Sequence, residues 1–307
     1  MSTDLLARAD GLRTERTPFV LATVVRAQRP TSAKAGDRAI VLSDGTIEGF
    51  VGGACAESTV RAEGMRLFAT GESTLLRITP EPDPPQPADE GLVVVGNPCL
   101  SGGTLEIFLE PVLPPVLVYV FGVAPIARAL MTVGAAVGYD IRAGTDPAAP
   151  IPPDAAAVVI ASHGRDEERV IVEALRAGVP YVGLVASRKR GAAVLAALDV
   201  PDELRERVRT PAGLDLGART PTEVALSVLA EVVQRRAARS AAEAGPVPPS
   251  APLPSLAVAE TATDPVCGMT VAAIPASLHL EHAGRTWYFC GAGCRQAFAD
   301  DPGRYGG

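Results

Sequence analysis

Three cysteines near the C-terminus have the spacing of a metal site. Cys290 and Cys294 are four residues apart, which places two thiols one helical turn apart, either on the same face of a helix or at a turn that enters it. The segments 278–282 and 285–289 predict a hairpin that can return the chain to Cys267. Three thiolates in so short a module suit a soft or borderline ion, Zn²⁺ or Cu(I). The alternative is that the thiols are only small apolar side chains in a packed core.

The fourth ligand of such a site stays open at this stage. His279, His282 and Met269 all lie in the same stretch of chain. The final segment, 263–307, is too short to fold readily on the burial of apolar side chains alone, so a structural metal is expected there.

Two glycine pairs, each beside a cysteine, form a second candidate site. Gly52 and Gly53 lie between a predicted strand and a predicted helix, directly before Cys55 and Glu57. Glycines let a ligand approach the backbone closely, and the N–H groups at a helix start attract an anion. A thiol at that helix end has a lowered pKa and becomes a better nucleophile.

The other glycine pair, Gly102 and Gly103, follows Cys99 and leads into a predicted strand. Two such motifs facing one pocket would suit an anionic ligand that contains sulfur. At both positions the alternative is a buried cysteine that acts as a small apolar side chain.

A third set of candidates follows the strands of an alternating strand–helix segment. In a parallel sheet the carboxyl ends of the strands face the ligand crevice. Cations at the start of a helix oppose its dipole, so the basic group in this set predicts a bound phosphate; a solvated basic surface is the alternative. The candidates are Gly122, Ser162, His163, Ser187, Arg188, Lys189, Arg190 and Asp215.

The elements that position these residues predict an α/β protein with three parts. Residues 1–113 combine apolar runs of strand length with one helix, near 56–69, and predict an α+β domain. Residues 114–237 alternate strands and helices and predict a doubly wound, Rossmann-like parallel sheet. The stretch 238–262 is rich in alanine, proline and serine and predicts a flexible linker to the module at 263–307.

The parallel sheet raises a second interpretation, a NAD(P)-dependent oxidoreductase. Gly122 stands at the first position of a dinucleotide fingerprint, but Ala124 and Ala127 replace the later glycines. The loss of the second glycine hinders the approach of a pyrophosphate to the backbone. Asp146 follows the second strand, where an acid that binds a ribose would stand. The fingerprint therefore favours this interpretation only weakly.

Composition restricts the partners and the compartment. A net charge of -7 argues against nucleic-acid binding. No apolar run reaches the roughly 20 residues of a membrane span. The N-terminus lacks the basic and apolar segments of an export signal, so a cytoplasmic location is expected. In a reducing compartment the five cysteines serve as thiols or metal ligands rather than in disulfides.

The C-terminal segment resembles the YHS domain, a small metal-binding module. Gly291 departs from the family pattern, which typically has serine at this position. The likeness spans the whole tail and is carried by Asp264-Pro-Val-Cys-Gly-Met269, His282-Ala-Gly284, Tyr288-Phe-Cys-Gly-Ala-Gly-Cys294, Phe298 and Pro302 to Tyr305.

The preceding three quarters of the chain, to about Arg236, resemble the XdhC/CoxI family of maturation proteins. Ala54 and Ala56 stand where that family more often has glycine and valine. The resemblance is carried by Gly36-Asp-Arg-Ala-Ile-Val-Leu42, Asp44-Gly45, Gly52-Gly53-Ala-Cys55-Ala-Glu57, Cys99, Gly102-Gly103-Thr-Leu-Glu106 and Glu110-Pro111, and Gly213-Leu-Asp215-Leu-Gly217 also matches.

This resemblance implies a chaperone rather than an enzyme, and no acid–base pair or catalytic triad stands out in the sequence. It implies binding of the molybdenum cofactor in its molybdopterin form, followed by sulfuration and insertion into a hydroxylase of the xanthine dehydrogenase or aerobic carbon monoxide dehydrogenase type. The implied partners are that client and a cysteine desulfurase or other sulfur donor, with a homodimer left open. A metal-handling protein whose main function lies in the tail is a further alternative. A Cu(I)-binding tail would suit a client with a molybdenum–copper centre.

Overall fold

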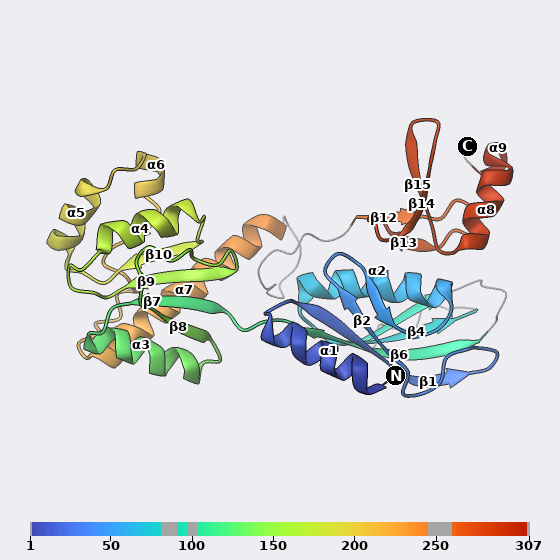
Figure 1. Cartoon of the computed structure of the whole chain (residues 1–307), viewed down its shortest axis with the longest axis horizontal. Coiled ribbons are helices and arrows are strands. Elements are labelled where there is room, and N and C mark those ends of the chain that lie inside the picture. Colours follow the sequence, from blue (N-terminus) through green and yellow to red (C-terminus); the bar gives the residue numbers. More distant parts are fainter. Residues whose placement is uncertain (1, 81–90, 97–102, 245–259, 306–307) are drawn as a thin grey trace. The chain divides into compact units, whose positions relative to one another are not determined.

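A computed structural model describes residues 2–80, 91–96, 103–244 and 260–305. The chain forms two compact units (Figure 1). The first unit joins residues 1–114 to residues 252–307, so the C-terminal module packs with the N-terminal domain. The second unit is residues 115–251.

The N-terminal domain is built on a six-stranded mixed sheet with the order β3-β2-β1-β6-β4-β5. β2 and β3 pair antiparallel and form a hairpin that turns at Asp44-Gly45. The strands are β1 (Phe19–Gln28), β2 (Arg38–Leu42), β3 (Ile47–Gly49), β4 (Thr74–Thr79), β5 (Leu92–Gly96) and β6 (Thr104–Val112).

Two helices cover opposite faces of this sheet: α1 (Ser2–Thr14) and α2 (Ala54–Thr70) (Figure 1). Successive residues of a strand point to opposite faces, and β1 shows this clearly. Phe19 packs with α1, whereas its neighbour Val20 packs in the cluster that α2 covers. The sequence interpretation placed only one helix in this domain, so α1 was missed.

The second unit is a parallel five-stranded sheet with the order β11-β10-β9-β7-β8. α3 and α7 cover one face and α4 and α5 the other, which confirms the predicted doubly wound fold. Its elements are β7 (Leu117–Phe121), α3 (Pro125–Ala136), β8 (Asp140–Gly144), β9 (Ala155–Ile160), α4 (Glu167–Arg176), β10 (Tyr181–Leu184), α5 (Arg188–Ala197), α6 (Asp202–Arg205), β11 (Val208–Arg209) and α7 (Pro221–Ala244).

The last helix of this unit, α7, begins at a capping box. The carboxylate of Glu223 accepts a 2.8 Å hydrogen bond from the backbone N–H of Thr220, and Glu223 N–H donates to Thr220 Oγ1 at 3.3 Å. α7 continues to Ala244, into the stretch predicted as linker. Alanine and arginine favour a helix once it has started, and neither requires an apolar face.

The C-terminal module packs an aromatic core between a hairpin and a short helix. Phe298 of α8 contacts Trp287, Phe289 and His282. The predicted hairpin over 278–289 is confirmed. The elements are β12 (Thr261–Thr263), β13 (Thr270–Ala272), β14 (Leu278–His282), β15 (Arg285–Phe289), α8 (Ala292–Asp300) and α9 (Pro302–Tyr305). Among the described helices of the whole chain, none is long and apolar enough to cross a membrane.

Candidate functional site

The fold brings the three C-terminal cysteines together. Cys267 Sγ lies 3.5 Å from Cys290 Sγ, which lies 3.7 Å from Cys294 Sγ. Thiolates at the corners of a tetrahedral zinc site with Zn–S bonds of about 2.3 Å are about 3.8 Å apart. The spacing of these sulfur atoms therefore fits a single metal ion of that size.

Three different elements supply the cysteines. Cys267 lies in the turn between β12 and β13, where Gly268 has a φ of 77°. Cys290 directly follows β15, and Cys294 lies in the first turn of α8. The hairpin β14–β15 thus carries the second half of the cluster back to the first, as its sequence predicted.

Asp264 is a member of the cluster that the sequence interpretation missed. Its carboxylate is fully buried, and its oxygen lies within 4.8 Å of the three sulfur atoms. Oδ1 accepts a hydrogen bond from Val266 N–H at 2.9 Å, and Oδ2 accepts one from Cys290 N–H at 2.8 Å. Asp264 therefore fixes the two loops that carry Cys267 and Cys290. An aspartate that begins an Asx turn before a cysteine was the available sequence signal.

The environment of these thiols favours a bound cation. The hydrogen bond with Cys290 lowers the pKa of the Cys267 thiol to about 7. Burial, together with the charge of Asp264, raises the pKa of Cys294 to about 12, and the hydrogen bond with Cys267 raises the pKa of Cys290. Several anions crowded in a buried place repel one another, whereas a metal ion would bind the thiolates and release their protons.

The other side chains considered for the fourth ligand lie differently. His279 and His282 are both described and neither belongs to the group of possible ligands around the cysteines. The Nδ1 atom of His279 is 2.8 Å from the carbonyl oxygen of Ser277, and His282 packs edge-on against Phe298. Met269 is buried and packs against the cluster.

The first glycine–cysteine motif forms the start of α2, as predicted. Gly52 has a φ of 139°, which favours glycine, and Gly53 precedes the helix in an extended conformation with no side-chain cap. Cys55 and Glu57 lie in the first turn, and the Cys55 side chain is half-buried. The exposed helix start and the nearby thiol keep the geometry expected of an anion site.

Of the second motif, Cys99 and Gly102 lie outside the described residues. Gly103 is described and stands just before β6. A Cβ atom at this position would lie 2.1 Å from the carbonyl oxygen of Pro30, so a side chain cannot be accommodated. The close approach of two backbone segments is thus sufficient to explain this glycine.

In the second unit, Glu167 organises the loop that follows β9. It is only 4% exposed and accepts hydrogen bonds from Gly164 N–H at 2.8 Å and Ser162 Oγ at 3.3 Å. It also forms an ion pair with Arg190. His163 lies in this loop with a φ of 55°. The sequence interpretation did not include Glu167, which lies five residues after Ser162 and three after Gly164.

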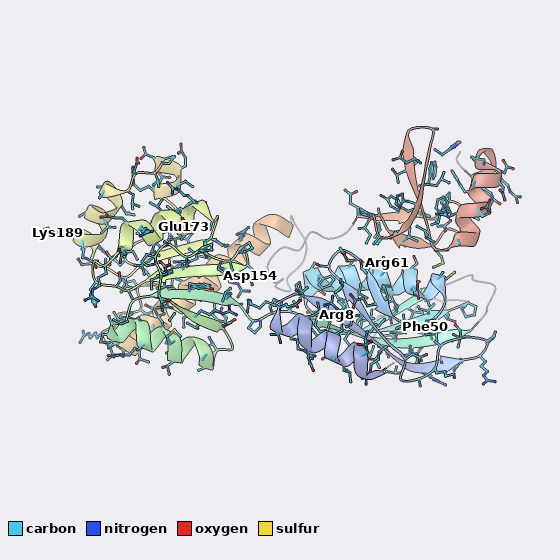
Figure 2. All side chains as sticks on the ribbon, viewed as in Figure 1. Arg8, Phe50, Arg61, Asp154, Glu173 and Lys189 are labelled. Atoms are coloured by element: carbon cyan, nitrogen blue, oxygen red, sulfur yellow. The ribbon has the colours of Figure 1, made fainter. Side chains whose placement is uncertain are left out.

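The basic residues predicted at the start of α5 therefore have different surroundings. Arg190 already has a carboxylate partner, whereas Arg188 and Lys189 are exposed, and Lys189 lies at the edge of this unit (Figure 2). Ser187 caps the helix, because its Oγ accepts a hydrogen bond from Arg190 N–H at 3.3 Å. A phosphate at this turn would meet Arg188 and Lys189 more readily than Arg190.

The remaining candidates of this unit have structural roles or lie at the surface. A Cβ atom at Gly122 would lie 2.2 Å from the carbonyl oxygen of Ala161, so strand packing explains this glycine without a dinucleotide. Asp215 is exposed. The nearby Gly213 donates its N–H to Glu231, a buried carboxylate that was not recognised in the sequence.

Comparison with known proteins agrees with this architecture: a glycine–cysteine α+β domain, a Rossmann-like domain and a cysteine-bearing C-terminal module. Residues 12–79 match the XdhC and CoxI family, and residues 118–232 match the XdhC Rossmann domain. Residues 262–307 match the YHS domain. The chain belongs to the XdhC and CoxI family, and its C-terminal module is a YHS domain.

Three curated proteins are similar to this chain. The molybdenum cofactor insertion chaperone PaoD of Escherichia coli (strain K12) is 25% identical over 265 residues, which cover 71% of this chain and 83% of PaoD. The E. coli protein YqeB is 27% identical over 261 residues; the match covers 75% of this chain but only 46% of YqeB. A probable xanthine dehydrogenase component of Bacillus subtilis (strain 168) is 33% identical over 84 residues, or 27% of this chain and 24% of that protein.

Proposed function

We propose that this chain binds the molybdenum cofactor in its molybdopterin form and assists its sulfuration and its insertion into a molybdenum hydroxylase. The family and the similarity to PaoD, which extends over most of the length of PaoD, support this role. The observation that carries the proposal in the structure is the start of α2, where Gly52, Gly53 and Cys55 lie together.

The residues at the start of α2 have the chemistry that such a ligand requires. The N–H groups after Gly53 offer hydrogen bonds and a partial positive charge to a phosphate or another anionic group. The thiol of Cys55 is a soft ligand that suits molybdenum or sulfur chemistry. The bound cofactor would supply the molybdenum centre, and the chain would hold and orient it.

The second unit contributes further polar groups in this proposal. The loop of Ser162 and His163 and the turn from Ser187 to Lys189 follow neighbouring strands, β9 and β10, at their carboxyl ends. Arg188 and Lys189 would bind the phosphate of the pterin.

The proposed partners follow from the chemistry. The client is a hydroxylase of the xanthine dehydrogenase or carbon monoxide dehydrogenase type, and a cysteine desulfurase or another sulfur donor would provide the sulfur atom. A NAD(P)-dependent oxidoreductase has less support, because Gly122 is explained by its contact with Ala161.

Co-purification tests the proposal. The chain is expressed in a host that accumulates the molybdenum cofactor, and bound pterin and molybdenum are measured after purification. We expect both in the wild type, a loss in Cys55→Ala, and retention in the matched variant Cys267→Ala, which removes a thiol from the tail instead. A wild-type protein that carries no pterin under these conditions would contradict the proposal.

A further inference from the structure

Cys55 of the glycine–cysteine motif lies at the cysteine cluster of the C-terminal module. Its side chain packs against the cluster that contains Cys267, Cys290 and Cys294. The Cys55 Sγ atom is 4.0 Å from the point that a Cβ atom at Gly291 would occupy. A fourth thiol, distant in sequence, therefore adjoins the three that the tail provides.

The docking of the module onto α2 is specific. α2 contacts β13, and Ile274, which follows that strand, packs against the core of the N-terminal domain. Gly45 allows this contact, because a Cβ atom there would lie only 2.0 Å from Ile274 Cδ1. The contact therefore depends on a glycine in the β2–β3 turn and an apolar side chain in the tail, which fixes the position of the cysteines next to α2.

Two helix starts converge at the thiols. Gly291 is the N-cap of α8, and a Cβ atom there would lie 3.7 Å from the Cβ of Ala54, the first residue of α2. Cys55 and Cys294 lie in the first turns of these two helices. The positive ends of both helix dipoles thus point toward the cluster.

The tail itself offers the three thiols and the carboxylate of Asp264 as possible ligands among its described residues. Both oxygens of Asp264 already accept backbone N–H groups, so this carboxylate positions the cysteine loops. His279, His282 and Cys55 all lie outside this group of mutually close ligand atoms, but the side chain of Cys55 packs against it. A closed structural site for a tetrahedral ion needs four protein ligands, and the three tail cysteines lack one.

We propose that Cys55 completes a tetrahedral four-thiolate zinc site with Cys267, Cys290 and Cys294. Four sulfur ligands in this arrangement favour Zn²⁺ over ions that prefer oxygen or planar geometry. The site ties the YHS domain to the glycine–cysteine motif of the N-terminal domain. It goes beyond the proposed function, since zinc binding here needs no pterin. If that function also holds, zinc and the molybdenum cofactor compete for the same thiolate.

Zinc binding to the full chain tests the site. Protein prepared without pterin and stripped of metal is titrated with Zn²⁺ against a chromogenic chelator. We expect the wild type to bind one zinc ion with high affinity. In Cys55→Ala the affinity should be lower by on the order of 100-fold or more, because removing a metal ligand lowers the affinity more than removing a side chain that only hydrogen-bonds to a ligand. Gly291→Ala is the matched control: its added Cβ would make only ordinary contacts at the same place, so zinc affinity should be unchanged.

Alkylation of the wild-type protein provides a second measurement that does not depend on a variant that folds. Thiol modification is followed at each cysteine by mass spectrometry, with and without zinc. Zinc should slow modification of Cys55 together with the three tail cysteines, and Cys290→Ser should abolish the protection of Cys55. Equal zinc affinity in Cys55→Ala and the wild type, or protection of the tail cysteines without Cys55, would overturn the proposal. Neither measurement involves the pterin, so failure of the proposed function would not affect them.

Discussion

The buried carboxylate of Asp264 accepts a 2.8 Å hydrogen bond from the backbone N–H of Cys290, 26 residues further along the chain. The other oxygen of the same carboxylate holds the turn that carries Cys267. One side chain thus sets the distance between the two halves of the cysteine cluster. Its charge also increases the attraction of the cluster for a cation.

Replacement of Asp264 by asparagine should weaken both the metal site and the fold of the module. The amide of Asp264→Asn has only one acceptor oxygen, so either Val266 N–H or Cys290 N–H would face an NH₂ group. We expect zinc affinity to fall about 10- to 100-fold. We also expect the free energy of unfolding of the metal-free module to fall by about 1–3 kcal/mol.

Fluorescence provides a local measurement of this loss, because Trp287 is the single tryptophan of the chain and lies in the module. Urea titration followed at Trp287 compares the wild type with Asp264→Asn. Asp301→Asn is the control, since Asp301 is an exposed carboxylate of the same module. Equal midpoints for all three proteins would show that the Asp264 hydrogen bonds do not stabilise the module.

Local sequence signals were sufficient for most of the fold. The strand–helix alternation after residue 114 predicted the parallel sheet, because burial on both faces produces short apolar runs. The capping box of Thr220 and Glu223 at the start of α7 is a signal of the same kind, since it depends only on residues close in sequence. The helix α1 was missed because its amphipathic pattern is weak: of its residues 4–14, whose burial is described, Ala9 and Leu12 are fully buried.

The relation between the two cysteine groups could not be predicted from the sequence. Cys55 and Cys290 were recognised separately, each from its own motif, but their contact depends on Ile274 docking beside Gly45. Such a contact leaves no periodic pattern. The buried acids Asp264 and Glu167 were missed for a related reason: their importance comes from backbone N–H groups that the folded chain presents to them.

A buried network in the second unit should contribute strongly to its stability. Tyr181 Oη donates a 2.7 Å hydrogen bond to Glu231, which also accepts from Gly213 N–H and Arg209. Burial, and then the bond to Glu231, raise the pKa of Tyr181, so its hydroxyl stays a donor at neutral pH. Tyr181→Phe removes one donor to a charged acceptor and should lower the free energy of unfolding by about 1–3 kcal/mol.

Hydrogen exchange of peptides from β9, β10 and α7 measures this effect within the unit. Tyr139→Phe is the matched control, because the Tyr139 hydroxyl makes only a 3.4 Å contact with Arg236. That variant should stay within about 0.5 kcal/mol of the wild type. A Tyr181→Phe protein with unchanged protection in β10 would show that Glu231 is satisfied without the tyrosine.

The basic turn at the start of α5 allows structural and binding roles to be separated. Arg190 is paired with the buried Glu167, so Arg190→Ala would leave a buried carboxylate without its partner. Removal of one member of a buried pair is costly, but Arg190 is itself one-third exposed, so we expect a loss of about 1–2 kcal/mol in stability. Lys189 is exposed, and Lys189→Ala should change stability by less than about 0.5 kcal/mol.

For pterin binding, Lys189→Ala should have the larger effect and Arg190→Ala the smaller. If Arg188 and Lys189 hold the phosphate of the pterin, Lys189→Ala should weaken pterin binding roughly two- to fivefold, the size expected of an exposed charge contact. Thermal unfolding and pterin retention are measured on the same preparations of both variants. If Lys189→Ala binds pterin like the wild type, the binding role is contradicted. If Arg190→Ala is as stable as the wild type, the structural role is contradicted. If the loss of stability in Arg190→Ala is the only effect seen, the turn is a structural element that holds the loop after β9.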